Sequence, residues 1–500
     1  MRKFCSLFFL ILTTLSSLFA QEPLDELLDG GLSGVPLHSH FASIDNNHYV
    51  IFSSAYLNQD VLVTLPENDG KGSQVQQQHP TDYVLLVAYE DANNIHGIYK
   101  HYNYKTQTYG LYLNSYQKAA ASAEWKPENL ISVPLDKSED IRVRSAVSPD
   151  RSKAAVALFL TNFKANSLKG SLVLAFDENG MRWKNPLDLE FENNTIQILD
   201  FAVSNNMKAY TSILSFDKDK DGKQRENEVL HLYESGEYGE LNNAECAIEF
   251  GSLSCGRLLM TRKGGVMMGG YYAPEPGKKE TGCYMVHYGM SPLECANISH
   301  EDFPETYYAY VHTSAGKKAK DFSVYPMAFY EFADGNVALL GDMYTTYNLT
   351  MTFSAGGNIV IHMADSRGDI TQFKTVGKMQ TSVMVSPPAS LNKYLFSYHA
   401  LMHNDKIHIF FSDNIKNYQG GSGQNSFVDV SMMGKMLYKG HCAAHCTLDH
   451  NGEVSKPELL MDYADYGGYM IAPLYVEDDG FVFLKTGKKA RQIAKLKHSF

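Results

Sequence analysis

The chain has 500 residues, a formal net charge of −12 and a hydrophobic fraction of 44%. This acidic balance argues against nucleic acid, whose phosphates need a basic surface, and against docking on an anionic lipid surface. The length suffices for two or three ordinary domains or for one large repetitive β-structure.

Residues 1–20 have the organisation of a secretory signal peptide. Two basic residues, Arg2 and Lys3, precede a long apolar run that ends in small residues. Loss of this segment takes the net charge from −12 to −14, because it carries two basic residues and no acidic one. No later stretch approaches the roughly 18 apolar residues of a membrane span. We therefore expect an exported protein, periplasmic, secreted or at the cell surface, with residues 21–37 as an N-terminal linker.

Short apolar or alternating runs recur from residue 38 onward, and helical patterns are nearly absent. Tyr, Phe, Val and Ile fill these runs, which suits half-buried strands, and Gly, Asp, Asn or Pro bound them. The fold class is therefore all-β, as a sandwich, a barrel or a propeller.

Similar polar turns join successive strand pairs, and their spacing favours a propeller. They occur at Ser148–Lys153, Ser204–Lys208, Arg262–Gly265, Ala333–Asn336, His403–Lys406 and Glu477–Gly480. The turns are about 50 to 75 residues apart, the size of one four-stranded blade with variable loops.

A second turn type, an Asp followed after two residues by Gly, recurs later in several units and suits an outer hairpin. Counting units gives six blades at 83–133, 141–192, 197–250, 257–312, 324–376 and 394–461. Strands at 470–496, completed by N-terminal strands at 38–63, make the seventh. The sequence thus predicts a single β-propeller over 38–500 with seven four-stranded blades closed by both termini. Six and eight blades are the alternatives.

Tyrosines crowd into one predicted blade. Those we expect to form a ligand surface are Tyr99, Tyr102, Tyr104, Tyr109 and Tyr112. Aromatic faces stack on sugar rings or anchor a protein partner. The alternative is structural, because tyrosine is a common strand residue.

The stretch from Asp217 to Glu228 matches the ligand spacing of an EF-hand calcium loop. The ligands would be the carboxylates of Asp217, Asp219, Asp221 and Glu228 and the carbonyl of Lys223. Both flanks alternate like strands, so we expect a structural Ca²⁺ in a hairpin rather than a helical sensor. The alternative is a solvated turn without metal, since interspersed basic residues repel a cation.

Six cysteines remain once Cys5 leaves with the signal peptide, namely Cys246, Cys255, Cys283, Cys295, Cys442 and Cys446. An even count in an exported chain is compatible with three disulfides. Proximity in sequence suggests Cys246 with Cys255 and Cys283 with Cys295, although six cysteines allow fifteen connectivities.

The stretch "HCAAHC", His441 to Cys446, would suit zinc if it were helical. It leads directly into a hairpin turn, which favours a strand. Residues four apart on a strand lie about 13 Å from each other, too far to share one ion. Ordinary histidines beside disulfide cysteines are therefore the preferred interpretation.

The stretches "ADGNVALLGDMYTTYN", "GNIVIHMADSRGDITQFKTVGKMQ" and "NDKIHIFFSDNIKN" carry a resemblance over about 320–500. This part is similar to exported β-propeller proteins of the Bacteroidota, and it departs from them at Asp342, where Glu is common. The turn at Asp177–Trp183 faintly resembles a sialidase Asp-box, with one residue too many. The resemblance implies a fold and a compartment, and no activity.

The nucleophile elbow, the zinc-protease motif, the phosphate-binding loop and the dinucleotide fingerprint are all missing from the sequence. The sequence therefore favours a binding or scaffold protein of the bacterial envelope, with a protein or a glycan as partner. The alternative is a carbohydrate-active enzyme, a glycoside hydrolase or lyase, with acidic residues in the central pocket.

If the hairpin holds Ca²⁺, removing the metal with a chelator lowers the melting temperature of the wild-type protein, because the ion binds only the folded state. Asp219→Ala should abolish this difference, and thermal unfolding with and without calcium measures it. A wild-type melting temperature that ignores calcium would contradict the prediction.

Overall fold

A computed structural model describes most of the chain after residue 23. The described residues are 24–26, 38–44, 47–54, 59–66, 73–118, 124–162, 167–187, 189, 195–218, 225–308, 322–348, 352–378, 380–384, 398–418, 428–429, 440–464, 470–486 and 491–498. The predicted signal peptide lies outside this part of the chain, and so do Asp219, Asp221 and Lys223 of the predicted calcium loop.

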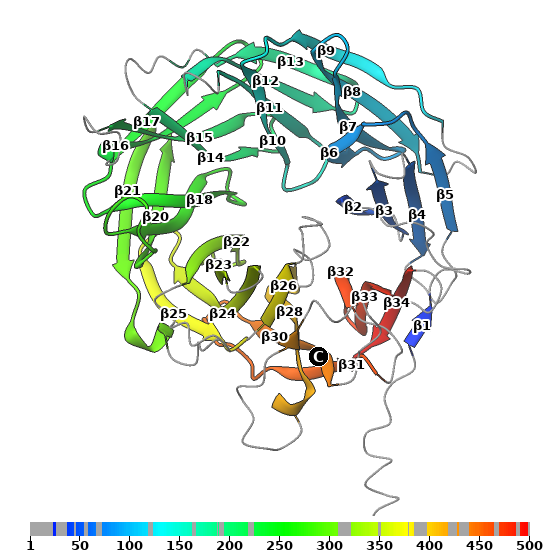
Figure 1. The fold of residues 1–500 in the computed structure, drawn as a ribbon, viewed down its shortest axis with the longest axis vertical. Helices are drawn as coiled ribbons and strands as arrows, with labels where there is room; N and C mark the ends of the chain where they lie inside the picture. Colours follow the sequence, from blue (N-terminus) through cyan, green and yellow to red (C-terminus); the bar gives the residue numbers. More distant parts are fainter. Residues whose placement is uncertain are drawn as a thin grey trace, which may run out of the picture.

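The described strands form eight sheets, each built on four antiparallel strands and arranged as one blade of a β-propeller, with the first strand of each blade nearest the axis (Figure 1). We number the blades 1 to 8 in ring order, starting from the sheet that begins at His38. No helix in the described part of the chain has the length and apolarity that crossing a bilayer requires.

The strands of each blade are given from inner to outer. Blade 1 consists of β2 (His38–Ile44), β3 (Asn47–Ser54), β4 (Gln59–Pro66) and β5 (Ser73–Gln78), and blade 2 of β6 (Val84–Glu90), β7 (Asn94–Asn103), β8 (Thr108–Gln117) and β9 (Glu128–Pro134). Blade 3 consists of β10 (Glu139–Val147), β11 (Ala154–Asn162), β12 (Ser167–Asp177) and β13 (Gly180–Pro186), and blade 4 of β14 (Thr195–Val203), β15 (Ala209–Lys218), β16 (Arg225–Ser235) and β17 (Leu241–Ala247).

Blade 5 consists of β18 (Ser252–Met260), β19 (Val266–Ala273), β20 (Gly282–Met290) and β21 (Leu293–Asp302), and blade 6 of β22 (Ser323–Glu331), β23 (Val337–Asn348), β24 (Thr352–Ala364) and β25 (Ile370–Val376). Blade 7 consists of β27 (Tyr398–His403), β28 (Lys406–Asn414), β30 (His441–Leu448) and β31 (Glu458–Asp462), and blade 8 of β32 (Met470–Glu477), β33 (Gly480–Thr486), β34 (Arg491–Lys497) and β1 (Leu24–Glu26). Blade 6 is extended by β26 (Gln380–Met384) and β29 (Val428–Asp429), and the short 3₁₀ helices are η1 (Glu305–Tyr308) and η3 (Ile415–Asn417).

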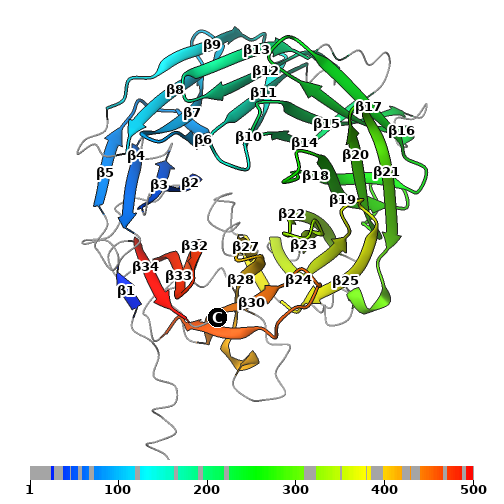
Figure 2. The same ribbon diagram turned by 180° about the vertical axis from the view of Figure 1, so that it is seen from behind.

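Both ends of the chain close the ring, as predicted, but in blade 8 rather than in a shared seventh blade. Strand β1 pairs antiparallel with β34, with Leu24 opposite Leu496, and the two lie side by side in Figure 2. The prediction of seven blades is wrong, because residues 38–63 start a blade of their own. The outer strand of that blade, β5, reads SQVQQQ and has no apolar alternation to reveal it. The closing strand lies in the segment 21–37 that we expected to be a linker.

The other six predicted blades and their first hairpin turns are confirmed. The outer turns are also confirmed, since each Asp accepts backbone N–H bonds within its turn and each Gly has positive φ. Asp449 Oδ1, for example, accepts from Asn451 N at 3.0 Å and Glu453 N at 2.8 Å, and Gly452 has φ of 79°. In a tight turn, some backbone N–H groups have no backbone acceptor. The Asp side chains accept hydrogen bonds from these groups.

The core consists of layers between neighbouring blades. Middle strands such as β19 are buried at every position, because adjacent blades cover both faces, whereas the outer strand β17 alternates between exposed and buried residues. One layer, for example, joins Leu232 of blade 4 to Met268 of blade 5. Each buried Leu, Phe or Met side chain contributes about 1.5–3 kcal/mol to such a layer.

Several inner strands contain β-bulges, and these link neighbouring blades. Register shifts leave Leu86 in β6, Ser254 in β18 and Met327 in β22 without a partner on the adjacent strand. Their carbonyls accept hydrogen bonds from inner strands of adjacent blades. The donors are Ser145 Oγ to Leu86 at 3.2 Å, Gln197 Nε2 to Ser254 at 3.1 Å, and the Arg257 guanidinium to Met327. The bulges therefore connect blade 2 to blade 3, blade 4 to blade 5, and blade 5 to blade 6.

One disulfide occurs among the described cysteines, and it differs from the expected pairing. Cys246 of β17 bonds Cys295 of β21, with Cα atoms 5.7 Å apart. Cys255 and Cys283 are unbonded, and they lie opposite Tyr271 on the two strands that flank β19. The expected pairs within hairpins are therefore wrong, and the bond instead joins the outer strands of blades 4 and 5. Cys442 and Cys446 are buried free thiols on β30.

We predict that Gln197→Ala lowers the free energy of unfolding by about 1 kcal/mol, because the Ser254 carbonyl loses its donor from the adjacent blade. Chemical denaturation measures the change, with Gln117→Ala, an exposed position of β8, as the control. Equal stability of the two variants would show that the bulge bond contributes nothing.

Candidate functional site

Strand alternation divides the predicted tyrosine surface into two sets. Tyr102 and Tyr109 lie opposite each other on β7 and β8, and Tyr104 follows in the turn between these strands. Tyr99 and Tyr112 form another opposed pair, which faces the other side of blade 2. The structure therefore brings together Tyr102, Tyr104 and Tyr109, and it separates them from Tyr99 and Tyr112.

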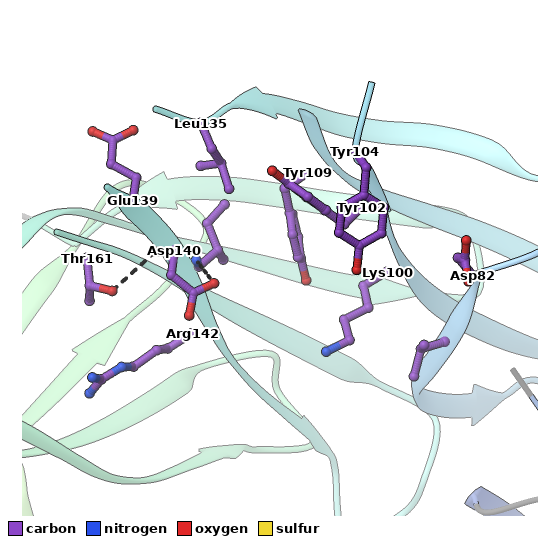
Figure 3. A pocket seen from close by; sticks show the side chains of 12 residues that line it. Asp82, Lys100, Tyr102, Tyr104, Tyr109, Leu135, Glu139, Asp140, Arg142 and Thr161 are labelled. Atoms are coloured by element: carbon purple, nitrogen blue, oxygen red, sulfur yellow. Dashed lines mark hydrogen bonds between the residues drawn. The ribbon is translucent and has the colours of Figure 1, made fainter. Parts of the chain in front are cut away.

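The first set lines a groove between blades 2 and 3 with a volume of about 710 Å³. The twelve side chains around it belong to Asp82, Val84, Lys100, Tyr102, Tyr104, Tyr109, Leu135, Glu139, Asp140, Ile141, Arg142 and Thr161. Figure 3 shows the tyrosines on one side and the charged start of β10 on the other.

The aromatic wall offers both a buried and an exposed ring. Tyr102 and Tyr104 meet edge to face, with ring centroids 4.7 Å apart and planes at 90°. Tyr104 is 77% exposed, whereas Tyr109 is buried at the bottom of the wall. Burial raises the pKa of Tyr109, and the negative charge of Asp140 raises it further. The Tyr109 hydroxyl therefore stays protonated and can donate a hydrogen bond.

The charged wall comes from the first residues of β10, and Lys100 of β7 adds a cation on the tyrosine side. Glu139 accepts hydrogen bonds from the Lys169 ammonium and from Asp136 N, the latter at 2.9 Å. These bonds lower the pKa of Glu139, so that it stays ionised. Asp140 and Arg142 are exposed toward the groove. The wall can thus both donate and accept hydrogen bonds.

Sequence reasoning missed this charged wall. Asp140 and Arg142 lie more than 30 residues after the tyrosines and meet them only because blade 3 packs on blade 2. The stretch "EDIRVR" contained a signal, since charged residues alternate with apolar ones at the start of an inner strand.

Tyr99 has a structural role. It is fully buried, and its hydroxyl donates to Asp60 Oδ2 at 2.7 Å and lies 3.0 Å from the hydroxyl of Tyr116. Tyr116 donates to the same oxygen at 2.5 Å. The two tyrosines thus satisfy one oxygen of a buried carboxylate between blades 1 and 2. Tyr112 packs edge to face on Tyr83 at 5.1 Å.

The predicted calcium hairpin does join two strands, β15 and β16, with Lys218 opposite Arg225. Asp217 Oδ2 accepts a hydrogen bond from Asn227 Nδ2 at 2.9 Å. Glu228 is buried and points to blade 5, where it accepts from Ser252 Oγ at 2.5 Å and Leu253 N at 2.9 Å. The other predicted ligands are outside the described residues, so the calcium site stays a prediction.

The stretch from His441 to Cys446 is a strand, β30, as expected. His445 meets its register partner on β31, Glu458, and through it a residue that follows β34. Its Nδ1 lies 3.1 Å from Glu458 Oε1, and the same oxygen lies 3.1 Å from His498 Nε2. These three residues form the one group of potential metal ligands found among the described residues, with ligand atoms within 4.8 Å of one another.

No family model and no curated protein matches the chain. Solved structures similar to it include an ulvan lyase of polysaccharide lyase family PL25 bound to a GlcA–Rha3S unit, with 11% identity over 71% of this chain and 87% of that chain and a TM-score of 0.39. Others are the WD40 domain of SCAP from fission yeast, with 10% identity over 93% and 99% and a TM-score of 0.35, and polysaccharide lyase Uly1, with 8% identity over 95% and 97% and a TM-score of 0.34. With every TM-score below 0.5, these similarities support no conclusion about function.

We predict that Tyr99→Phe destabilises the protein by about 1–3 kcal/mol, because the buried Asp60 carboxylate loses a hydrogen-bond donor. Tyr104→Phe, at an exposed ring, should leave stability unchanged. Urea denaturation of both variants beside wild type measures the difference. Identical unfolding of the two would contradict the division of the tyrosines into structural and groove-lining sets.

Proposed function

We propose that the protein is an exported β-propeller of the bacterial envelope that binds a glycan chain in the groove between blades 2 and 3. The observation that carries this proposal is a groove with three tyrosines and Lys100 on one wall and Asp140 and Arg142 on the other.

The two walls suit the two kinds of surface on a sugar. The C–H faces of a pyranose ring stack on aromatic rings, and Tyr104 presents such a ring to solvent. Sugar hydroxyls need hydrogen-bond donors and acceptors at once, and Arg142, Lys100 and Asp140 supply them. A groove of about 710 Å³ has the size of ordinary small-ligand sites.

The state of Glu139 favours binding over hydrolysis in the groove. A glycosidase needs a carboxylic acid whose pKa is raised so that it can protonate the leaving group. Glu139 has the opposite shift, because Lys169 holds it ionised.

Two carboxylates on other inner strands are used in structural contacts. Asp200 accepts from Leu258 N at 2.7 Å, and Glu90 pairs with Lys118 at 3.0 Å. These contacts favour the binding protein over an enzyme with acidic residues in a central pocket.

Export and calcium binding belong to the proposal. The basic and apolar N-terminal segment supports export, and so does the disulfide between Cys246 and Cys295, since such bonds persist in oxidising compartments. The spacing from Asp217 to Glu228 supports a Ca²⁺ that stiffens the hairpin between β15 and β16.

The experiment is a glycan array followed by calorimetric titration of the glycan that binds. Tyr104→Ala should weaken the affinity about five- to tenfold, because an aromatic contact of this kind is worth about 1 kcal/mol. Tyr238→Ala is the matched control, since Tyr238 is 85% exposed in the turn between β16 and β17 of blade 4. The proposal is overturned if no glycan binds, or if both variants bind with the affinity of wild type. Glycan cleavage by the purified protein would favour the enzyme alternative.

A further inference from the structure

Three side chains from blades 7 and 8 converge on one point. His445 lies on β30, Glu458 is the first residue of β31, and His498 follows the end of β34. We call these residues the His–Glu–His cluster. His445 and His498 approach the same carboxylate oxygen, Glu458 Oε1, each at 3.1 Å. The cluster therefore connects the last strand of the chain to the preceding blade.

The ligand types and distances fit a zinc ion. Two imidazoles and one carboxylate are a known zinc ligand set, in which the fourth position is left to water. With zinc–ligand bonds of about 2.0–2.1 Å, ligand atoms on a tetrahedron lie about 3.3 Å apart. The two nitrogen–oxygen distances are already close to this value. The third separation, between His445 Nδ1 and His498 Nε2, is within 4.8 Å and must shorten when zinc binds. His498 can make this shift, because it lies just after its strand and is partly exposed.

A second layer of contacts orients the inner ligand. His445 Nε2 lies 3.1 Å from His408 Nδ1. When Nδ1 of His445 binds a metal, its Nε2 keeps the proton and donates a hydrogen bond to Nδ1 of His408. Such a hydrogen bond fixes the tautomer and the ring orientation of metal-binding histidines. The ring of Phe481 packs on both His445 and His498, with centroids 4.9 and 5.4 Å away, and covers the apolar side of the cluster.

Exposure leaves a route for the ion. The side chain of His445 is 2% exposed, whereas that of Glu458 is 50% exposed. A metal can therefore enter from the Glu458 side and keep a water as its fourth ligand.

Other acid–histidine contacts in the described residues have a different composition. His96 meets Asp91, and His403 meets Asp478, in pairs of one imidazole and one carboxylate. Two imidazoles around one carboxylate occur together at the His–Glu–His cluster.

We propose that the His–Glu–His cluster is a zinc site with His445 Nδ1, Glu458 and His498 Nε2 as ligands and an open fourth position for water. The bound ion joins blade 7 to the residue after β34, the strand that pairs with β1 at the closure of the ring. It therefore strengthens the interface next to that closure. This site is separate from the groove between blades 2 and 3 and does not depend on the proposed glycan binding.

The test uses untagged, metal-stripped full-length protein titrated with ZnCl₂ by calorimetry, together with thermal unfolding. Wild type should bind one equivalent of zinc at this site and melt at a higher temperature when saturated. Glu458→Gln and His498→Asn should each weaken zinc binding at least tenfold and remove the rise in melting temperature. Both positions are partly exposed, so the variants should fold, and near-UV circular dichroism checks this.

His450→Asn is the matched control, because His450 is an exposed histidine in the turn between β30 and β31 that lies outside the cluster. It should bind zinc as wild type does. An excess of CaCl₂ should not displace the zinc, because calcium prefers an all-oxygen ligand set. The proposal is overturned if wild type neither binds zinc nor gains stability, or if the two cluster variants bind zinc like the control.

Discussion

The bulges of the inner strands are the feature on which the arrangement of the blades depends. Each bulge adds a residue without a register partner on the adjacent strand, and a carbonyl without a hydrogen bond costs about 1–3 kcal/mol where it is buried. The carbonyls of Leu86, Ser254 and Met327 are satisfied by side chains from the next inner strand. A blade is thus complete only beside its neighbour, so the apolar layers between blades and the hydrogen bonds at the axis require the same packing.

The candidate sites follow from this architecture. Because each blade packs face to face on the next, side chains paired within one blade meet side chains of the neighbouring blade that are far away in sequence. The groove forms where the tyrosines of β7 and β8 face the start of β10. The His–Glu–His cluster forms where β30 and β31 face the end of β34. Both candidate sites therefore depend on how two blades are placed.

Local signals in the sequence predict the propeller but not the contacts between blades. The polar turns and apolar runs located six blades correctly, because each signal lies within one hairpin. The blade count failed at β5, a glutamine-rich outer strand, and at the three-residue strand β1. The disulfide partner of Cys246 and the approach of His498 to Glu458 are set by the packing of blades, which no spacing in the sequence reports. Of the five predicted ligand tyrosines, strand alternation alone would have separated Tyr99 from Tyr102.

The central functional claim is that the ligand binds between two blades and not in the centre of the ring. Hydrogen–deuterium exchange of the protein with and without its bound glycan tests this most directly. If the ligand binds between blades 2 and 3, protection should increase in peptides covering Lys100–Tyr109 and Glu139–Arg142, the two walls of the groove. Protection confined to the inner strands of the other blades, such as β18 and β22, would contradict it and would place the ligand in the centre of the ring.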